Sequence, residues 1–276
     1  MKSKSIIFLK TLSVMLIVIA GGCSSMKNTI NDMYQDIGKI NPEKITEDDI
    51  KQVPEIVQNY LRFTNIIGKQ RIKSVRLKQT GDFRLKPEQG FKKMRAVQYF
   101  NVDSVEFYWK GKVNIITAVD KFINGKGSLT VKLLGLIRVA QAEGPEADQG
   151  EILRFLAEGV WFPSVFINDY ITWELLDDHS AKATIRVNGI SASAVFHFND
   201  KYEVEKITAK RYMESDGKFK LEDWEIQIVE YKEFSGIMIP NRANVIWKLS
   251  SGDFCWYKLE ISEIEYNNPS IYKGSK

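Results

Sequence analysis

Three charged side chains near the middle of the chain could do chemistry together: Glu151, Arg154 and Glu158. Their i, i+3 and i+7 spacing places them on one side of a helix. Two carboxyl groups fixed in this way can act as a general acid and a general base. The sequence offers no companion group to stabilise an electrophile or to hold a metal. A hydrolase that uses Glu151 or Glu158 is therefore the least favoured interpretation of this cluster.

The same three side chains have two structural interpretations. Acids three or four residues from an arginine stabilise a helix by about 0.2–0.5 kcal/mol when they form a solvated ion-pair face. Arginine also pairs with carboxylates in a bidentate geometry, so the cluster could instead tie its helix to the open edge of a sheet. Because exposed pairs of this kind are common, the solvated face is favoured over the tie.

The rest of the chain carries no recognisable catalytic or metal-binding pattern. His179 and His197 have no partner at a metal-ligand spacing, and the sequence lacks H-E-x-x-H, C-x-x-C, G-x-S-x-G and P-loop motifs. We therefore predict no catalytic residue, no metal site and no cofactor. A binding protein is favoured over an enzyme, although the sequence does not decide the question.

A helix must position the charged cluster, and the sequence predicts one at about residues 148–160. Gly144 and Pro145 break the preceding strand, Asp148 can cap the helix, and Pro163 stops it. Its apolar stripe is formed by Ile152, Phe155, Leu156 and Val160.

Most of the remaining chain is predicted to form strands. From about residue 72 the hydrophobic period is 2, which is typical of half-buried strands. Asn188-Gly189 predicts a two-residue hairpin that pairs Val187 with Ile190. We expect a mainly β (α+β) fold, in which about 10–12 strands form one large curved antiparallel sheet or incomplete β-barrel. Three helices complete the predicted fold: short amphipathic ones at 26–37 and 54–63, and the inserted one at 148–160. The helices at 54–63 and 148–160 are expected to act as lids over the sheet.

Several predicted strands carry large apolar residues on both faces. Tyr108 lies between Phe107 and Trp109, and residues 254–257 are apolar or aromatic throughout. Either the sheet closes around its own side chains, or it half-closes around a cavity that takes a ligand. The candidate cavity residues are Phe107, Trp109, Leu133, Phe155, Trp161, Trp173, Trp224 and Trp247.

The N-terminus has the pattern of a signal peptide. Three lysines precede the uncharged residues 11–20, a run too short for the ~20 residues that span a bilayer. Small residues at 20–22 then precede Cys23, an arrangement that resembles the bacterial lipoprotein box. The resemblance implies a lipid anchor on Cys23, and Ser24-Ser25 after it implies the periplasmic side of the outer membrane. Cys255 is then left without a disulfide partner.

Composition agrees with one globular domain outside the cytoplasm. The chain has 276 residues, of which 44% are hydrophobic and 27% charged. Its net charge is +4, and loss of the three leader lysines leaves +1, so nothing favours nucleic-acid binding. We predict four segments: a signal peptide at 1–22, a lipidated tether at 23–53, a β-rich domain at 54–267 and a flexible tail at 268–276.

The chain is similar to a bacterial protein family that carries no functional name. The resemblance extends over about residues 54–267. It rests on Glu151, Arg154 and Glu158 with Trp161 and Pro163, then on Tyr231, Gly236, Pro240 and Trp247. The order of elements also looks like that of LolA/LolB-type lipoprotein carriers, which implies an incomplete antiparallel barrel with helices around an apolar cavity.

Three functions follow from these patterns. The favoured one is a membrane-anchored envelope lipoprotein that binds a lipid or another apolar ligand. The second is a scaffolding lipoprotein with a packed interior that contacts other envelope proteins. The third is the hydrolase described above.

Overall fold

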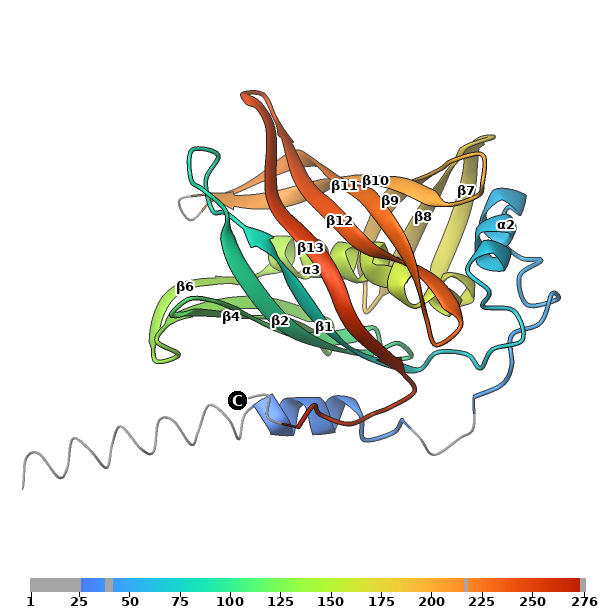
Figure 1. The fold of residues 1–276 in the computed structure, drawn as a ribbon, viewed down its shortest axis with the longest axis horizontal. Coiled ribbons are helices and arrows are strands. Elements are labelled where there is room, and N and C mark those ends of the chain that lie inside the picture. The colour runs from blue at the N-terminus through green and yellow to red at the C-terminus, as the bar shows by residue number, and fades with distance from the viewer. Residues whose placement is uncertain (1–25, 38–41, 216–217, 274–276) are drawn as a thin grey trace, which may run out of the picture.

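The structure is a computed structural model that describes residues 26–37, 42–215 and 218–273. The predicted leader and Cys23 lie outside the described residues. Within them the dominant element is a single antiparallel sheet of thirteen strands, which exceeds the expected 10–12. The fold class is the predicted one: mostly β, with an open curved sheet and few helices (Figure 1).

The sheet consists of two meanders joined by helical elements. The first meander contains β1 (Ser74–Phe83), β2 (Lys92–Asn101), β3 (Glu106–Val113), β4 (Ile116–Ile123), β5 (Lys126–Leu133) and β6 (Ile137–Glu143). The connection contains α3 (Pro145–Glu158) and the short 3-10 helices η1 (Gly159–Trp161) and η2 (Pro163–Ile167). The second meander contains β7 (Ile171–Asp177), β8 (Ser180–Val187), β9 (Ile190–Phe198), β10 (Val204–Ser215), β11 (Lys218–Phe234), β12 (Ile237–Leu249) and β13 (Gly252–Tyr266).

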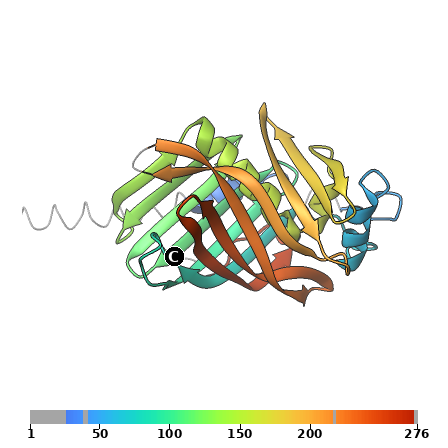
Figure 2. The ribbon, with the colours of Figure 1, turned by 90° about the horizontal axis from the view of Figure 1, so that it is seen from above.

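The two meanders join at the ends of the chain. The last strand, β13, pairs with the first, β1, so the sheet order runs β6 to β1 and then β13 to β7. The edge strands β6 and β7 do not pair with each other. Instead they are linked in sequence through α3, which packs against β5, β9 and β10 on the concave side of the sheet (Figures 1 and 2).

The hairpin around Asn188-Gly189 has the predicted register. Val187 pairs with Ile190, and both turn residues have positive φ angles, 52° and 77°, as a type I′ turn requires. This register places one set of alternate residues of the two strands on the inner face, and its members away from the turn are buried: Ala181, Ala183 and Ile185 of β8, and Ala192, Ala194 and Phe196 of β9. Turn chemistry and alternation thus determine this part of the sheet.

The interior of the curved sheet is filled. Ile152, Leu153, Phe155 and Leu156 of α3 are fully buried in one large apolar core with inward residues of both meanders. The helix α2 (Glu55–Phe63) closes one end of this core through its buried residues Ile56, Val57, Tyr60 and Leu61. None of the described helices has both the length and the apolar character of a membrane span.

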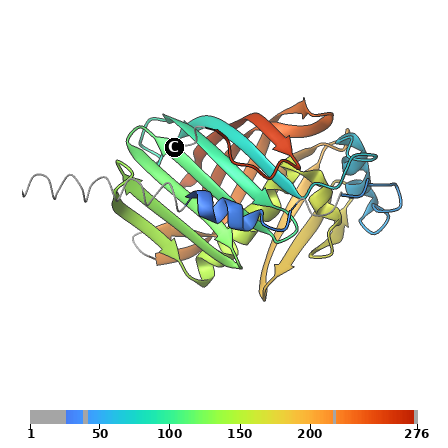
Figure 3. The ribbon, with the colours of Figure 1, turned by 90° about the horizontal axis from the view of Figure 1, so that it is seen from below.

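The outer face of the first meander is also covered, by the chain's own ends. The segment 26–37, helical over 26–33, lies across these strands (Figure 3). Its buried side chains form a second apolar cluster with Tyr99 and Tyr108. We expected a frayed tail after Asn267, but Tyr272 is buried in this cluster as well. The doubly apolar strand at 107–109 therefore has a partner on each face.

Candidate functional site

The predicted charged cluster lies inside the molecule, with Arg154 at its centre. The Arg154 guanidinium donates from Nε to Glu158 Oε1 at 2.8 Å and from a terminal nitrogen to Asp120 Oδ2 at 2.6 Å. Its central carbon lies 5.0 Å from the ring centroid of Phe107 and 5.2 Å from that of Trp109. Two ion pairs and two aromatic faces thus fix one arginine of α3 against β3 and β4.

A chain of buried amides extends the cluster across the sheet. Gln98 Nε2 donates to Glu158 Oε2 at 2.7 Å, and Gln79 Nε2 donates to Gln98 Oε1 at 3.1 Å. Gln79 Oε1 in turn accepts from Trp109 Nε1 at 3.0 Å and from the Tyr257 hydroxyl at 3.3 Å. The network therefore joins α3 to β1, β2, β3 and β13, on which these residues lie.

Glu151 occupies the other end of the cluster. Burial raises its pKa most, and the charge of Asp120 together with a hydrogen bond to it raises it further, to about 8. Arg211 on β10 lies 3.4 Å from Glu151 Oε1 and opposes this rise. The second oxygens, Glu151 Oε2 and Asp120 Oδ1, have no other partner. A proton on Glu151 gives both oxygens a partner, because the carboxyl group of Glu151 can then donate to the Asp120 carboxylate.

The structure corrects the favoured interpretation of this cluster. A solvated ion-pair face is wrong, since the side chains of Arg154 and Glu158 are only 15% and 11% exposed. The cluster does tie α3 to the sheet. It reaches interior positions of β2, β4 and β10, however, rather than the open edges β6 and β7.

The aromatic candidates do not line one common cavity. Phe107, Trp109 and Phe155 pack in the core, as do Trp161 and Trp247. Trp173 is partly buried beside that core, where its Nε1 donates to the Phe166 carbonyl at 3.0 Å. Leu133 lies outside the core, at the β5–β6 turn. Only Trp224 lines a surface hollow.

That hollow is a slot where two neighbouring strands separate. β9 and β10 pair only from Val204–Phe198 to Thr208–Val195. Beyond this point residues 190–194 pair with β8 alone and residues 209–215 with β11 alone. Figure 2 shows the two strands diverging over α3. The resulting hollow has a volume of about 740 Å³, within the range of ligand sites.

The slot has small apolar walls and a polar floor. Ala192, Ala194 and Ala209 line it together with the Trp224 ring and with Gln149 of α3. Polar side chains from the outer faces of the strands lie around its mouth, and two acids are among them: Lys182, Lys210, Lys248, Asp223, Glu225, Ser191, Ser193 and Thr208. Small side chains on facing strands leave room that larger ones would fill.

Two buried N–H groups near this floor have no acceptor. They are Trp224 Nε1 and Arg211 Nε, and the Arg211 guanidinium carbon lies 5.2 Å from the centroid of the Trp224 ring. Gln149 Oε1 is also unpartnered. A buried donor without an acceptor costs about 1–3 kcal/mol, so such groups are rare in folded proteins. Trp224 and Gln149 line the slot and Arg211 contacts the Trp224 ring, so unpartnered polar groups are concentrated beside this hollow.

Two further hollows among the described residues have a different character. One, of about 480 Å³, lies over outward side chains of β1, β2, β12 and β13. The other, of about 660 Å³, lies at the η2 end and is lined by four aspartates with Arg71, Asn168 and Tyr170. Glu151 and Glu158 line none of these three hollows.

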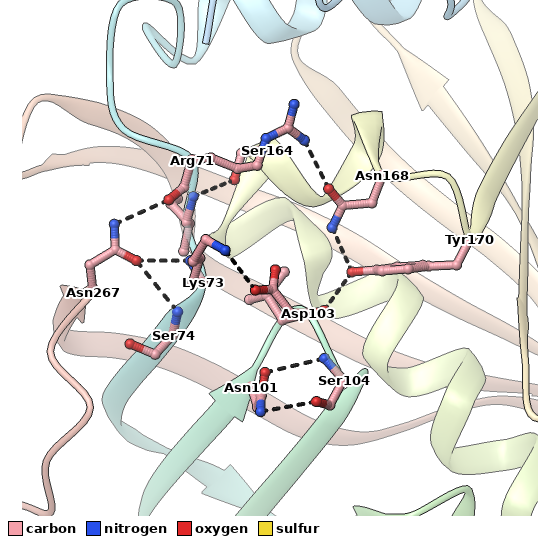
Figure 4. A network of polar contacts seen from close by, with 12 residues as sticks. Arg71, Lys73, Ser74, Asn101, Asp103, Ser104, Ser164, Asn168, Tyr170 and Asn267 are labelled. Carbon is pink, nitrogen blue, oxygen red and sulfur yellow. Dashed lines mark hydrogen bonds and ion pairs between the residues drawn. The ribbon is translucent and has the colours of Figure 1, made fainter. Parts of the chain in front are cut away.

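The polar groups at the η2 hollow hold the protein together (Figure 4). Arg71 donates to Asn168 Oδ1 at 2.9 Å, Asn168 donates to the Tyr170 hydroxyl at 2.8 Å, and that hydroxyl donates to the Val102 carbonyl at 2.7 Å. Asn267, at the end of β13, accepts from the Lys73 amide at 2.8 Å. These polar groups already have hydrogen-bond partners within the protein, in contrast to the unpartnered groups at the slot.

No metal site can be assembled from the described residues: they contain no group of three or more His, Cys, Asp or Glu side chains placed to hold an ion. His197 lies on the outer face, where Nε2 is 3.0 Å from the Thr208 hydroxyl. Burial, followed by the charge of Lys206, lowers its pKa. Cys255 is a free thiol.

Sequence reasoning missed three members of the site: Asp120, Gln149 and Arg211. Arg211 had a detectable signal, since it continues the inward alternation of Ile207 and Ala209 and is thus a charged residue on a core face. Asp120 is likewise an inward residue of β4, two positions from the buried Phe122.

Comparison with known proteins gives a family and two similar folds. A family described as "Family of unknown function (DUF6544)" matches residues 43–259, which confirms the resemblance to a family without a functional name. No curated protein matches the chain.

Two solved structures resemble the chain over most of its length. A LolA superfamily protein from Nitrosomonas europaea is 14% identical, with a TM-score of 0.43; 76% of this chain and 92% of that one are covered. A putative outer membrane lipoprotein-sorting protein domain from Vibrio parahaemolyticus is 11% identical, with a TM-score of 0.47; 79% of this chain and 93% of that one are covered.

Proposed function

The chain belongs to this family of unknown function, DUF6544, and from its own geometry we propose that it binds an amphiphilic ligand in the slot between β9 and β10. The ligand has an apolar chain and a head group with an acceptor oxygen, such as a carboxylate. The observation that carries the proposal is the pair of unpartnered buried donors, Trp224 Nε1 and Arg211 Nε, beside a hollow with small apolar walls.

The two parts of the ligand match two parts of the slot. An apolar chain removes from water the surfaces of Ala192, Ala194 and Ala209, at about 25 cal/mol per Å² buried. A carboxylate supplies the acceptor that Trp224 and Arg211 lack, and hydrogen bonds to charged groups contribute about 1.5–3 kcal/mol each. The charge at the mouth discriminates little between ligands, because Asp223 and Glu225 lie among its three lysines and Lys210 pairs with Asp223 at 2.8 Å.

A titration with a fluorescent fatty acid tests the apolar part of the site. Ala209→Leu narrows the slot, whereas Ala118→Leu adds the same atoms to a partly buried alanine on β4. Both proteins have the same N-terminus, so uptake through an anchor or leader cancels in the comparison. We expect a loss of affinity of about tenfold or more in Ala209→Leu alone, corresponding to ~1.4 kcal/mol. Equal affinities in the two variants would contradict the proposed site.

The head-group contacts are tested by Trp224→Phe, which removes the indole N–H and keeps an aromatic ring. Because the donor serves an oxygen of the ligand, binding of a fatty acid should weaken more than binding of an alkane-tailed probe without a head group. If both probes lose the same affinity, the change reflects the smaller ring and not the hydrogen bond.

We also propose that the protein works at the bacterial cell envelope, anchored through Cys23 on the periplasmic side of the outer membrane. The proposal is supported by the leader pattern and by the small residues before Cys23. Radioactive palmitate should label the wild-type chain, and Cys23→Ser should lose the label. Equal labelling of the two chains would remove the anchor assignment.

A scaffolding role remains the second candidate, because the concave side of the sheet is filled by α3 and not by an open cavity. In that case the outer surface would contact other envelope proteins. Crosslinking of intact cells distinguishes the two: a scaffold should give specific protein adducts in Ala209→Leu as in wild type, while no ligand copurifies with either.

A further inference from the structure

One corner of the first meander ends in exposed apolar side chains. Ile115, in the β3–β4 turn, is 55% exposed, and Leu134, in the β5–β6 turn, is 62% exposed. The Leu134 amide donates to the Ile115 carbonyl at 2.7 Å, so the two turns lie side by side. Ile137 and Val139 on β6 are 59% and 56% exposed. We call these four residues the apolar tip.

A row of cations lies immediately behind the apolar tip. Register places Arg95, Lys112, Lys132 and Arg138 in one cross-strand row, interrupted only by Thr117. Cross-strand partners share one face of a sheet, so these side chains point together. None of the four forms an ion pair with another described residue.

This cation row is on the outer face. At its β2 end Arg95 shares a hollow with Asp82 and Glu260, whereas the cross-strand partners of Lys112, Lys132 and Arg138 include no acidic residue. Lys110, two residues before Lys112 and thus on the same face, contacts Met26 of the outer segment at 3.9 Å. Along β3 to β6 the first carboxylate met from the tip is Asp120, which is buried on the inner face. The corner therefore presents an apolar end with three unopposed cations behind it: Lys112, Lys132 and Arg138.

The N-terminal end of the described chain is close to this corner. Met26 contacts Lys110, and Val113 at the turn is three positions further along β3, about 10 Å away at ~3.3 Å per residue. The preceding residues include the uncharged run 11–20 and Cys23. Whatever fixes the N-terminus at a membrane would thus hold the same corner close to that surface.

We propose that the apolar tip inserts into an anionic lipid bilayer, with the cation row at the level of the head groups. Apolar side chains at the end of a rigid hairpin pair bury in the interfacial region without unpairing any strand. Lysine and arginine behind them meet the negative surface potential of anionic lipids. The inference does not depend on a ligand in the slot.

Position-specific fluorescence on the full chain tests the proposal. In a background of Cys23→Ser and Cys255→Ser, an environment-sensitive dye is attached to I115C, to L134C or to the control L175C. Leu175 is equally exposed, at 55%, but lies on β7, the opposite edge strand. With vesicles of phosphatidylcholine and phosphatidylglycerol, we expect a blue shift and quenching by a lipid-borne nitroxide at 115 and 134 only.

A charge reversal tests the cation row in the same assay. Lys112→Glu with Lys132→Glu and Arg138→Glu should abolish the shift, whereas the same reversal at Lys44, Lys51 and Lys201 should leave it. Unshifted emission at 115 and 134 with vesicles would overturn insertion. A shift already present in buffer would assign the tip to a second copy of the chain. An equal shift with phosphatidylcholine alone would overturn the role of the cation row.

Discussion

At the scale of residues, the balance of charge in the buried cluster explains why Glu151 keeps its proton. Three carboxyl groups, those of Asp120, Glu151 and Glu158, face only two guanidinium groups. With every group ionised the cluster would carry an uncompensated negative charge in a medium of low polarity. A proton on Glu151 makes the charges equal, in agreement with its pKa of about 8.

Replacing Arg154 should be among the most damaging single changes in the protein. Arg154→Met leaves Asp120 and Glu158 as buried charges without the cation that pairs with them, which costs about 3–5 kcal/mol of unfolding free energy. Arg242→Met is the control, because the Arg242–Glu230 pair is about half exposed and should cost about 0–1 kcal/mol. Urea unfolding of the wild type and of the two variants measures both losses of unfolding free energy. Similar losses in the two variants would mean that the buried pairs contribute no more than surface ones.

The stability should depend on pH through Glu151. Its pKa in the folded state, about 8, is above its pKa in the unfolded chain. At a pH between these two pKa values, folding therefore takes up a proton. Stability from this group is therefore present at acidic pH and is lost as pH rises through about 8, by at most about 1.4 kcal/mol per pH unit.

Glu151→Gln should remove that dependence. The amide is neutral at every pH and has nearly the same shape, so the variant's unfolding free energy between pH 5 and 8 should fall less steeply than that of the wild type. Chemical denaturation at several pH values gives the two slopes. Parallel slopes would show that Glu151 is ionised throughout this range in the folded protein.

Sequence spacing predicted which residues act together here but not where they lie. The i, i+3 and i+7 pattern of Glu151, Arg154 and Glu158 correctly indicated a common side of one helix. The prediction of a solvated side assumed that only the apolar stripe of the helix is buried. Ten of the fourteen residues of α3 are buried, because sheet strands surround the helix, and spacing within a helix contains no information about that enclosure.

At the scale of elements, a glycine sets how closely α3 approaches the sheet. A Cβ on Gly127 of β5 would lie 2.7 Å from the Ala147 carbonyl oxygen, which is backbone and cannot rotate away. The Asp148 carboxylate also accepts a hydrogen bond from the Gly127 amide at 2.7 Å. The first turn of α3 is thus fastened directly to the backbone of β5.

Gly127→Ala should push α3 away from β5 and destabilise the protein by about 1–3 kcal/mol, as overpacking does. Gly90→Ala is a matched control, since nothing lies within 4 Å of a Cβ at that position. Thermal unfolding followed by circular dichroism compares them. An unchanged midpoint in Gly127→Ala would show that α3 has room to move.

Asp148 also illustrates a limit of predicting elements from sequence. It was expected to cap a helix over 148–160, but α3 begins at Pro145 after Gly144, and the Asp148 carboxylate bonds to another strand. A capping residue and a residue that bonds to a distant strand look identical in sequence. The hairpin at Asn188-Gly189 was predictable because its turn determines its own geometry.

At the scale of the whole molecule, the pairing of β1 with β13 holds the two meanders together, although about 190 residues separate the paired positions Val75 and Tyr266. Contacts between distant segments form late in folding, because closing a long loop loses conformational entropy before the stabilising contacts are made. The strand order was not predictable for the same reason. Nor was the divergence of β9 from β10, because alternation along one strand does not say where its neighbour leaves it.

Pulse-labelled hydrogen exchange during refolding should reveal this order. Alternate amides of β1 face β2, a local neighbour, or β13, a distant one, so a single strand supplies both the test and its control. Amides that bond to β2 should become protected before those that bond to β13. Simultaneous protection along β1 would mean that the two meanders assemble in one step.

The position of the segment 26–37 has a mechanical consequence. A pull on the N-terminus loads this segment first. Side-chain packing holds it, with hydrogen bonds that include those from the Tyr34 hydroxyl to the Val75 carbonyl and from the Asn101 side-chain amide to the Met33 carbonyl, and it is not part of a strand ladder. Contacts of that kind yield one after another under force, whereas the paired strands resist together. We therefore expect this segment to separate from the sheet before any strand does when the N-terminus is pulled, which would expose Tyr99 and Tyr108 while the thirteen strands stay paired.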